Sequence, residues 1–381
     1  MNLIYVIDYI YPAIRSGDSR AAISEVLSLK RNGQNVFVIS NYAENGDSVK
    51  GIKFWIDGIG LVNNYWYIKE NIIDAVVVHQ ISSIESAIEL RREYECVLIG
   101  RIHVQYDKLL AISRILKCRE EDIVSRLSLE STVRKYGDFL QYCDALIGVE
   151  VSLTSLYASD KYWYFPPILG LEDMYASRLR KRLMYTTKKK IESIIVGGRL
   201  TDPAKGFDRI IELAQLCETN RIRLSIVGNI SKYQSGLINK LSCVTLYDWI
   251  DGNDEYVELV SKADAFVVTS YYESFGLMTI EALLQGLFVF SCGQGFLKYF
   301  KELIPDIYFI DCMLLPSEYA RNVIGAIKLI NSEFSLNKKK FNNCVDILLG
   351  EMIQSYDASR YLDILRKIII SNCHKETLKI L

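Results

Sequence analysis

Residues 265–282 read Ala-Phe-Val-Val-Thr-Ser-Tyr-Tyr-Glu-Ser-Phe-Gly-Leu-Met-Thr-Ile-Glu-Ala, and they decide the fold of the second half of the chain. The apolar run Ala265–Val268 predicts a buried strand, the polar residues after it predict a loop, and a helix is expected to begin near Gly276. Backbone N–H groups at a helix N-terminus bind anions, phosphates in particular. Gly276 would also let a ligand approach the backbone closely. The stretch therefore predicts an anion site after a strand of an α/β domain.

Two carboxylates flank this expected anion site. Glu273 lies in the loop before the helix, and Glu281 lies just over one turn into it. A carboxylate in the position of Glu281 can accept hydrogen bonds from both hydroxyls of a diol. The alternative is that both are surface carboxylates beside a helix start, and the stretch by itself leaves the two interpretations open.

A second glycine-rich turn supplies cations. The stretch Ile-Ile-Val-Gly-Gly-Arg-Leu at 194–200 is followed by Lys-Gly-Phe at 205–207, which predicts a strand, a turn at Gly198 and a helix. Arg199 is suited to bidentate contact with phosphate, and Lys205 adds a second positive charge. Loops at the carboxyl ends of parallel strands lie where ligands bind, so these cations and the helix N–H groups would converge on a diphosphate. Alternatively, both side chains belong to a solvated loop.

Short apolar runs alternate with longer amphipathic stretches along the whole chain. This alternation predicts parallel sheets with helices on both faces. The expected strands are Leu3–Ile7, Val36–Ile39, Ala75–Val78, Cys96–Ile99, Ala145–Val149, Tyr162–Phe165, Ile194–Val196, Leu224–Val227, Val244–Leu246, Ala265–Val268 and Phe288–Phe290. The expected helices include Ser19–Arg31, Asp208–Cys217, Glu255–Lys262, Leu277–Gln285 and Ser355–Lys379. Because the strands form two series, we expect an α/β protein with two Rossmann-like domains.

The boundary between the domains is expected near the adjacent prolines Pro166-Pro167, which are followed by a basic stretch. We expect an N-terminal Rossmann-like domain over residues 1–168 and a linker over residues 169–190. A C-terminal Rossmann-like domain is expected over residues 191–354. The last residues, 355–381, are expected to form a helix that packs back towards the N-terminal domain.

The composition excludes several classes of protein. The 381 residues include 45 basic and 46 acidic side chains, and the resulting net charge of −1 argues against a nucleic-acid binder. Nine cysteines, an odd number without a Cys-x-x-Cys pair, indicate free thiols in a reducing cytosol. The N-terminus lacks the basic start of a signal peptide, and no apolar run approaches the ~18 residues that a membrane span needs. A cytoplasmic location is therefore expected.

The sequence also lacks the motifs of several metal and nucleotide sites. It contains no P-loop, no His-Glu-x-x-His, no Asp-x-Asp triplet and no Gly-x-Gly-x-x-Gly. The three histidines, His79, His103 and His374, are too few and too scattered for a histidine-rich metal site. We therefore expect neither a metal nor a bound cofactor.

Taken together, these motifs resemble glycosyltransferase family 4, whose members have the GT-B fold. The family carries two glutamates separated by seven residues with Phe-Gly between them, matched here by Glu273, Phe275-Gly276 and Glu281. It also carries Gly-Arg-Leu followed by Lys-Gly, matched by residues 198–200 and 205–206. The order and the spacing of these motifs match as well.

The resemblance extends, with weaker motifs, to other parts of the chain. Leu224–Gly228 is similar to the family's next C-terminal element, and Tyr11–Asp18 is similar to its loop after the first strand. His103 matches a family histidine that faces the donor sugar; the alternative is a lone polar histidine in a loop. His79 ends another expected strand and either lines the same cleft or belongs to the core.

The resemblance implies two domains that face each other across a cleft, the first for the acceptor and the second for the donor. It implies metal-independent, retaining transfer of a sugar from a UDP- or GDP-sugar to a hydroxyl of a saccharide. The catalytic residues would be Arg199 and Lys205 on the diphosphate, Glu273 on the donor sugar, and His103 on that sugar from the other domain. The donor-binding residues would be Gly17, Gly198, Gly228, Asn229, Ser274, Phe275, Gly276, Leu277 and, on the ribose, Glu281.

Family members often elongate lipid-linked saccharides, so the resemblance implies a saccharide or lipid-linked saccharide acceptor in bacterial surface polysaccharide, lipopolysaccharide or glycoconjugate biosynthesis. The basic stretch Arg101–Lys135 with interleaved leucines predicts either an interfacial helix on the cytoplasmic face of the inner membrane or an ordinary amphipathic helix of its own domain. Two other functions stay open: a non-catalytic subunit that binds a nucleotide sugar, and another GT-B enzyme such as a nucleotide-sugar epimerase.

Overall fold

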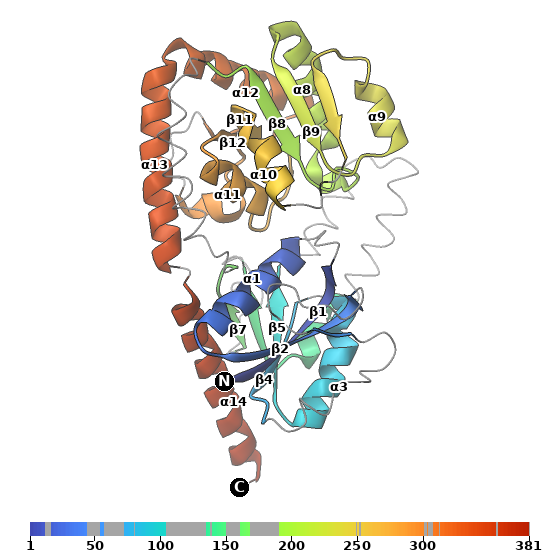
Figure 1. The fold of residues 1–381 in the computed structure, drawn as a ribbon, viewed down its shortest axis with the longest axis vertical. Helices are drawn as coiled ribbons and strands as arrows, with labels where there is room; N and C mark the ends of the chain where they lie inside the picture. Colours follow the sequence, from blue (N-terminus) through green and yellow to red (C-terminus); the bar gives the residue numbers. More distant parts are fainter. Residues whose placement is uncertain are drawn as a thin grey trace. The chain divides into compact units, whose positions relative to one another are not determined.

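The computed structural model describes residues 1–11, 17–43, 54–56, 72–79, 81–103, 135–137, 139–149, 161–167, 190–248, 250, 253–300, 303, 308–311, 313–355 and 357–380. The chain divides into two compact units (Figure 1). The first comprises Met1–Tyr106, Glu130–Leu171 and Ile353–Leu381, and the second contains Glu172–Met352. The C-terminal segment is therefore part of the first unit.

The first unit is built on a seven-stranded sheet whose neighbouring strands are all parallel. Its strands are β1 (Asn2–Tyr11), β2 (Asn35–Ala43), β3 (Phe54–Ile56), β4 (Ala75–Val78), β5 (Val97–Ile102), β6 (Ala145–Gly148) and β7 (Tyr162–Tyr164). They lie in the order β3-β2-β1-β4-β5-β6-β7. Both β4 and β5 are buried along their whole length, as expected for parallel strands covered on both faces.

Helices cover both faces of this sheet. They are α1 (Gly17–Arg31), α3 (Ile84–Tyr94) and α14 (Ala358–Ile380), with a short 3-10 turn, η1 (Ile81–Ser83). Tyr5 of β1 packs in one buried cluster with Val26 of α1 and Leu365 of α14, whereas the next residue, Val6, packs in another with Leu90 of α3. Successive side chains of a strand point to opposite faces, so α1 and α14 cover one face and α3 the other.

The second unit is built on a five-stranded parallel sheet in the order β10-β9-β8-β11-β12. Its strands are β8 (Ser193–Gly197), β9 (Arg223–Val227), β10 (Val244–Tyr247), β11 (Ala265–Val267) and β12 (Phe288–Phe290). Its helices are α8 (Phe207–Asn220), α9 (Lys232–Ile238), α10 (Asn253–Ser261), α11 (Leu277–Leu284), α12 (Pro316–Ser332) and most of α13 (Phe334–Ser355), with 3-10 turns η2 (Pro203–Lys205) and η3 (Gly295–Phe300).

Both sheets place their first strand in the interior and reverse the direction of strand order beside it. The reversal lies between β1 and β4 in the first unit and between β8 and β11 in the second. In open parallel sheets, ligands bind outside the carboxyl ends of the strands at this point. The topology therefore singles out the ends of β1 and β4 in one unit, and the loops after β8 and β11 in the other.

The expected fold class, two Rossmann-like domains with parallel sheets, is confirmed. Each of the eleven expected strands overlaps a strand of the structure. Strand β3 (Phe54–Ile56) was not predicted from the sequence. It has three residues and is paired only to β2 within the described sheet, and so short a run carries no alternation of apolar and polar residues.

One expectation about Arg101 is wrong. The stretch Arg101–Lys135 was expected to be helical, but Arg101 lies in β5 with 1% of its surface exposed, and residues 104–134 lie outside the described residues. The basic composition of the stretch suggested a helix, but Arg101 itself belongs to the buried parallel strand that precedes it. Within the described residues, no helix is long and apolar enough to cross a membrane.

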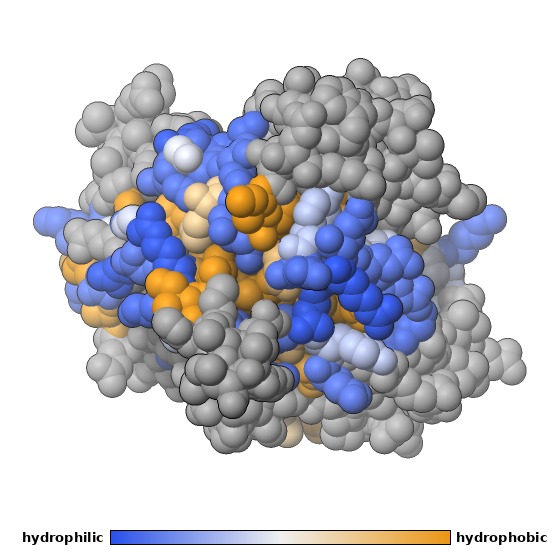
Figure 2. Space-filling model, turned by 90° about the horizontal axis from the view of Figure 1, so that it is seen from below, coloured by the Kyte–Doolittle hydropathy of each residue, from blue (hydrophilic) through white to orange (hydrophobic). Residues whose placement is uncertain are grey.

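Among the coloured residues of the face shown in Figure 2, hydrophilic ones prevail and apolar ones gather in smaller areas. The described residues of the first unit include three strongly exposed large apolar side chains, Ile72, Tyr142 and Ile370. They come from three separate segments of the chain. Single exposed apolar side chains of this kind are ordinary features of a protein surface.

Candidate functional site

The loops that follow β8 and β11 are joined by an ion pair between Lys205 and Glu273. The Nζ atom of Lys205 lies 2.9 Å from Oε2 of Glu273, and the two side chains are 21% and 22% exposed. Lys205 ends η2, a turn that Asp202 caps by accepting a hydrogen bond of 3.0 Å from the Ala204 N–H group. Because the pair is partly open to water, Lys205 can exchange its carboxylate partner for another anion at little cost.

Hydrogen bonds from the β11 loop hold the same turn in place. The Thr269 hydroxyl donates to the Lys205 carbonyl at 2.8 Å, and the Tyr271 N–H group donates to the Ala204 carbonyl at 2.8 Å. The position of Lys205 is therefore set by the neighbouring loop as well as by its own turn.

Gln294, in the loop after β12, fixes the backbone beside Glu273. Its Oε1 atom accepts a hydrogen bond of 2.8 Å from the Glu273 N–H group, and its Nε2 atom donates to the Tyr271 carbonyl at 3.0 Å. The Ser270 hydroxyl lies 3.4 Å from Oε2 of Glu273. Three loops at the carboxyl edge of the sheet thus contact Glu273, two at its carboxylate and one at its backbone N–H group.

Arg209 of α8 supports the β11 loop from inside the protein. Its side chain is fully buried, and its Nη1 atom donates to the carbonyls of Thr269 at 3.1 Å and Ser270 at 3.4 Å. Its guanidinium lies 3.7 Å and 4.6 Å from the ring centres of Tyr271 and Tyr319, a cation–π arrangement. Arg209 was not predicted from the sequence, because a lone arginine near the start of a helix ordinarily faces solvent.

Two glycines bring the loops after β8 and β9 into contact. Gly198 and Gly228 have φ angles of +137° and +130°, and a side chain at Gly228 would collide with the Gly198 carbonyl oxygen. Glycine is therefore required here for close backbone approach. Arg199 and Asn229, which follow these glycines, are exposed.

The start of α11 matches the expected strand–loop–helix pattern. Gly276 caps the helix with a φ angle of +88°, a left-handed conformation that favours glycine. Ser274 and Leu277 on either side are half-buried, and Phe275 is buried. Glu281 is only 6% exposed, so it is not a surface carboxylate.

In the first unit, His79 and His103 form a pair at the carboxyl ends of β4 and β5. Nδ1 of His79 lies 2.9 Å from Nε2 of His103, and the rings are stacked with their centres 5.0 Å apart. The two residues are 4% and 8% exposed. His103 is therefore not a lone loop histidine, and His79 touches it directly.

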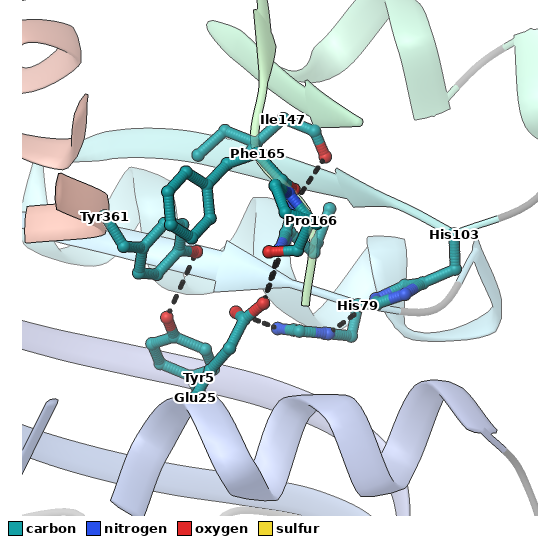
Figure 3. A network of polar contacts seen from close by, with 9 residues as sticks. Tyr5, Glu25, His79, His103, Ile147, Phe165, Pro166 and Tyr361 are labelled. Atoms are coloured by element: carbon teal, nitrogen blue, oxygen red, sulfur yellow. Dashed lines mark hydrogen bonds and ion pairs between the residues drawn. The ribbon is translucent and has the colours of Figure 1, made fainter. Parts of the chain in front are cut away.

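A buried ion pair stands behind the two histidines (Figure 3). Arg101 donates from Nε and Nη2 to Oε1 of Glu25 at 2.9 and 2.6 Å, and Oε2 of Glu25 lies 3.4 Å from Nε2 of His79. The remaining donors of Arg101 reach the carbonyls of Ile147, Phe165 and Pro166. Neither Glu25 nor the role of Arg101 was predicted from the sequence, because helical periodicity does not show which face of α1 carries a paired carboxylate.

Burial and the charge of Arg101 act in opposite directions on the pKa of Glu25 but in the same direction on that of His103. Burial alone raises the pKa of Glu25, but the charge of Arg101 and the contact with His79 outweigh it and lower that pKa to about 2. Burial is the main cause that lowers the pKa of His103 well below its ordinary value, and the positive charge of Arg101 adds to it. At neutral pH, Glu25 is therefore ionised and His103 is neutral.

The expected site residues fall on both units. The second unit brings Gly198, Gly228 and the Lys205–Glu273 pair to the carboxyl edge of its sheet. The first unit carries His103 and Gly17, the first residue of α1. Among the described residues, no group of three or more His, Cys, Asp or Glu is arranged to hold a metal ion.

Part of this chain matches a known protein family. Residues 180–319 match the model of the family described as glycosyl transferases group 1. The chain is also 30% identical over 153 residues to an uncharacterised 41.2 kDa protein of the cps region of Klebsiella pneumoniae. That match covers 40% of this chain and 40% of the Klebsiella protein.

Solved structures resemble the chain over nearly its whole length. The HepE protein of Anabaena, in complex with UDP-glucose, has a TM-score of 0.60 and 14% identity, with 100% of each chain covered. WaaG, a glycosyltransferase involved in lipopolysaccharide biosynthesis, has a TM-score of 0.64 and 18% identity, covering 95% of this chain and 99% of WaaG. The fold of this chain is therefore the GT-B fold of glycosyltransferases, and its residues 180–319 carry the group 1 pattern.

Proposed function

We propose that this protein is a retaining glycosyltransferase that moves a sugar from a nucleotide diphosphate sugar to a hydroxyl of a saccharide. The observation that carries the proposal is the partly exposed Lys205–Glu273 ion pair, which lies at the strand-order reversal beside the start of α11. A diphosphate would take over the ammonium group of Lys205, and Glu273 would be released to accept hydrogen bonds from sugar hydroxyls.

In this proposal, the donor is bound by groups with complementary chemistry. Lys205 and the exposed Arg199 hold the diphosphate, together with backbone N–H groups at Phe275–Leu277. Glu281 holds the ribose hydroxyls, and His103 contacts the donor sugar. The glycine turns at 198 and 228 allow the backbone to approach the donor closely.

The proposed reaction needs no covalent intermediate with the protein. The bond between the anomeric carbon and the β-phosphate oxygen breaks, and its electron pair leaves with the nucleotide diphosphate. The acceptor oxygen forms the new bond to the same face of the anomeric carbon, and its proton passes to the departing phosphate. Negative charge therefore grows on the diphosphate, where Arg199 and Lys205 can stabilise it without a divalent cation.

We propose an acceptor in bacterial surface polysaccharide, lipopolysaccharide or glycoconjugate biosynthesis, either a saccharide or a lipid-linked saccharide, reached from the cytoplasmic face of the inner membrane. The resemblance to a protein of the Klebsiella cps region supports this setting. HepE, which shares the fold, was solved with UDP-glucose, so uridine donors are the first to test, with guanosine donors beside them.

The proposal is tested with a panel of UDP- and GDP-linked hexoses, scored by thermal stabilisation and by release of the nucleotide diphosphate in the presence of saccharide acceptors. We expect one donor to stabilise the protein by about 2.7 kcal/mol at a hundredfold excess over its Kd, and to be turned over. The anomeric proton of the product, observed by NMR, is expected to show the configuration of the donor.

Glu281→Gln, which keeps the size of the side chain, is expected to abolish turnover while the protein stays folded. Glu258→Gln is the matched control, because Glu258 is an exposed carboxylate of the same unit, 2.8 Å from Lys262. Full activity of Glu281→Gln would contradict the site assignment. Donor binding without turnover for any acceptor would favour a non-catalytic subunit.

A further inference from the structure

The buried groups of the first unit form a line that ends at His103 (Figure 3). The line runs from Arg101 of β5 to Glu25 of α1, then to His79 and His103, with separations of 2.6, 3.4 and 2.9 Å between consecutive polar atoms. Every member is at most 8% exposed. Since a neutral imidazole has one protonated and one unprotonated nitrogen, each contact along such a line restricts the next one.

The proton positions follow from the charged end of the line. Arg101 holds Glu25 as an anion, and an ionised carboxylate is an acceptor only. The Nε2 atom of His79 lies 3.4 Å from Oε2 of this carboxylate. The two atoms do not form a hydrogen bond, but the negative charge of the carboxylate favours a proton on the nitrogen that faces it. The Nδ1 atom of a neutral His79 is then an acceptor, so the 2.9 Å contact requires a proton on Nε2 of His103.

The fixed charges around His79 balance one another in this arrangement. Arg101 and Glu25 cancel one another, and a charged imidazole would leave a net positive charge in a site that excludes water. The other side chains that face the line are polar but uncharged: Tyr5 of β1 has its ring centre 5.4 Å from that of His79, and Tyr361 of α14 lies under the Arg101 guanidinium at 5.3 Å. Burial raises the pKa of both tyrosines, so they stay protonated.

We propose that Glu25 and His79 are positioning residues that lock His103 in the tautomer protonated at Nε2, so that its Nδ1 atom acts as a hydrogen-bond acceptor. The contribution to catalysis rests on the proposed function, in which His103 contacts the donor sugar. An acceptor at Nδ1 selects a donor-sugar hydroxyl, which can donate a proton into the contact, over a carboxylate at the same position, which cannot.

The tautomer itself can be measured without reference to catalysis. The chain has only three histidines, His79, His103 and His374, so ring ¹⁵N spectra of histidine-labelled protein are simple to assign with His103→Gln and His374→Gln. At pH 7 we expect both His79 and His103 to show a protonated Nε2 and an unprotonated Nδ1. A protonated Nδ1 on His103, or a charged ring on His79, would overturn the proposal.

Glu25→Gln tests whether the side chain at position 25 sets the tautomers of His79 and His103. Arg101 would bind the carbonyl oxygen of the new amide, which turns the NH₂ group towards Nε2 of His79. The tautomers of both histidines should then reverse, and Nδ1 of His103 should become protonated. If Glu25→Gln folds and the His103 spectrum is unchanged, Glu25 does not set this tautomer; if it does not fold, the wild-type spectrum still decides the proposal.

Kinetics separate this proposal from the proposed function. Glu25→Gln and His79→Phe should each lower kcat/KM for the donor about tenfold, as expected for the loss of one oriented hydrogen bond. Lys262→Ala, at an exposed lysine of the second unit, should leave kcat/KM unchanged. If the wild-type protein turns over no donor but shows the expected ring spectrum, the proposed function is contradicted and the tautomer proposal stands. If turnover depends on His103 but not on Glu25 or His79, the proposed function stands and the positioning role of Glu25 and His79 is contradicted.

Discussion

Each unit carries an ion pair on its parallel sheet, but the two pairs differ in exposure. In the first unit, Glu25 of α1 and Arg101 of β5 form an ion pair whose side chains are 0% exposed. Between β8 and β11, Lys205 and Glu273 form a pair with about a fifth of each side chain exposed. A fully buried pair cannot change partners without a large penalty, whereas a partly exposed pair can be opened by a ligand. The first arrangement fixes geometry, and the second leaves groups available for binding.

The largest effect is expected from removing the carboxylate of the buried pair. Glu25→Ala leaves Arg101 charged and uncompensated, and should lower the free energy of unfolding by about 3–5 kcal/mol in urea titrations. The same substitution at the partly exposed pair, Glu273→Ala, should cost about 1 kcal/mol or less. Equal losses in the two variants would remove the distinction drawn here between the units.

Activity should show the opposite order. Lys205→Ala removes a cation from the growing charge of the diphosphate, and kcat should fall by about 10²–10³-fold while the free energy of unfolding stays within about 1 kcal/mol of the wild type. Nucleotide release under saturating donor measures the first quantity and urea titration the second. Lys262→Ala serves as the matched control at an exposed lysine. A wild-type rate in Lys205→Ala would contradict the role of the exposed pair.

Acid should weaken the first unit through Glu25. The pKa of Glu25 in the folded protein is about 2, below its ordinary value of 4.5, so its ionised form stabilises the fold. This stabilisation, on the order of 3 kcal/mol, is fully present above about pH 4.5 and is lost as the pH falls towards 2. The lowered pKa of His103 reduces stability at a higher pH than Glu25 does. Below about pH 6.5, His103 binds a proton in the unfolded chain but not in the folded chain, so the free energy of unfolding falls.

Urea titrations from pH 7 to pH 3 measure this loss, and Glu25→Gln isolates the part that belongs to Glu25. The difference in stability between the two chains should narrow as the pH falls. A constant difference over this range would mean that Glu25 is not held ionised by its surroundings.

The smallest effect is expected from a substitution beside the exposed pair that leaves both Lys205 and Glu273 in place. Gln294→Leu removes the partner of the Glu273 N–H group and the donor to the Tyr271 carbonyl. We expect a loss of about tenfold in kcat/KM, corresponding to one or two hydrogen bonds that orient the loop. Steady-state kinetics with varied donor give this value. An unchanged kcat/KM would show that Glu273 is positioned by Lys205 alone.

The sequence predicted the second unit more completely than the first. The motif residues Lys205, Glu273 and Gly276 are close in sequence to the strands that carry them, so local patterns located both the strands and the loops. Glu25, His79 and Arg101 come from three distant elements, and their contacts depend on the pairing of β1, β4 and β5. Local periodicity does not contain that information, and a buried charged residue looks like a surface one until its partner is known.

The position of Tyr361 has a consequence for the order in which the protein is made. This residue of α14 packs against Phe165 and Arg101 and contacts the Tyr5 hydroxyl at 3.3 Å, although the two tyrosines are 356 residues apart in sequence. During synthesis, every strand of the first sheet therefore leaves the ribosome long before α14, the last of the helices that cover this sheet. The second sheet, which ends at Phe290, can be completed while the first still lacks its last covering layer. The unit whose strands are synthesised first is thus completed last. Until α14 is synthesised, the apolar residues that it covers stay exposed, and such exposed surface promotes aggregation.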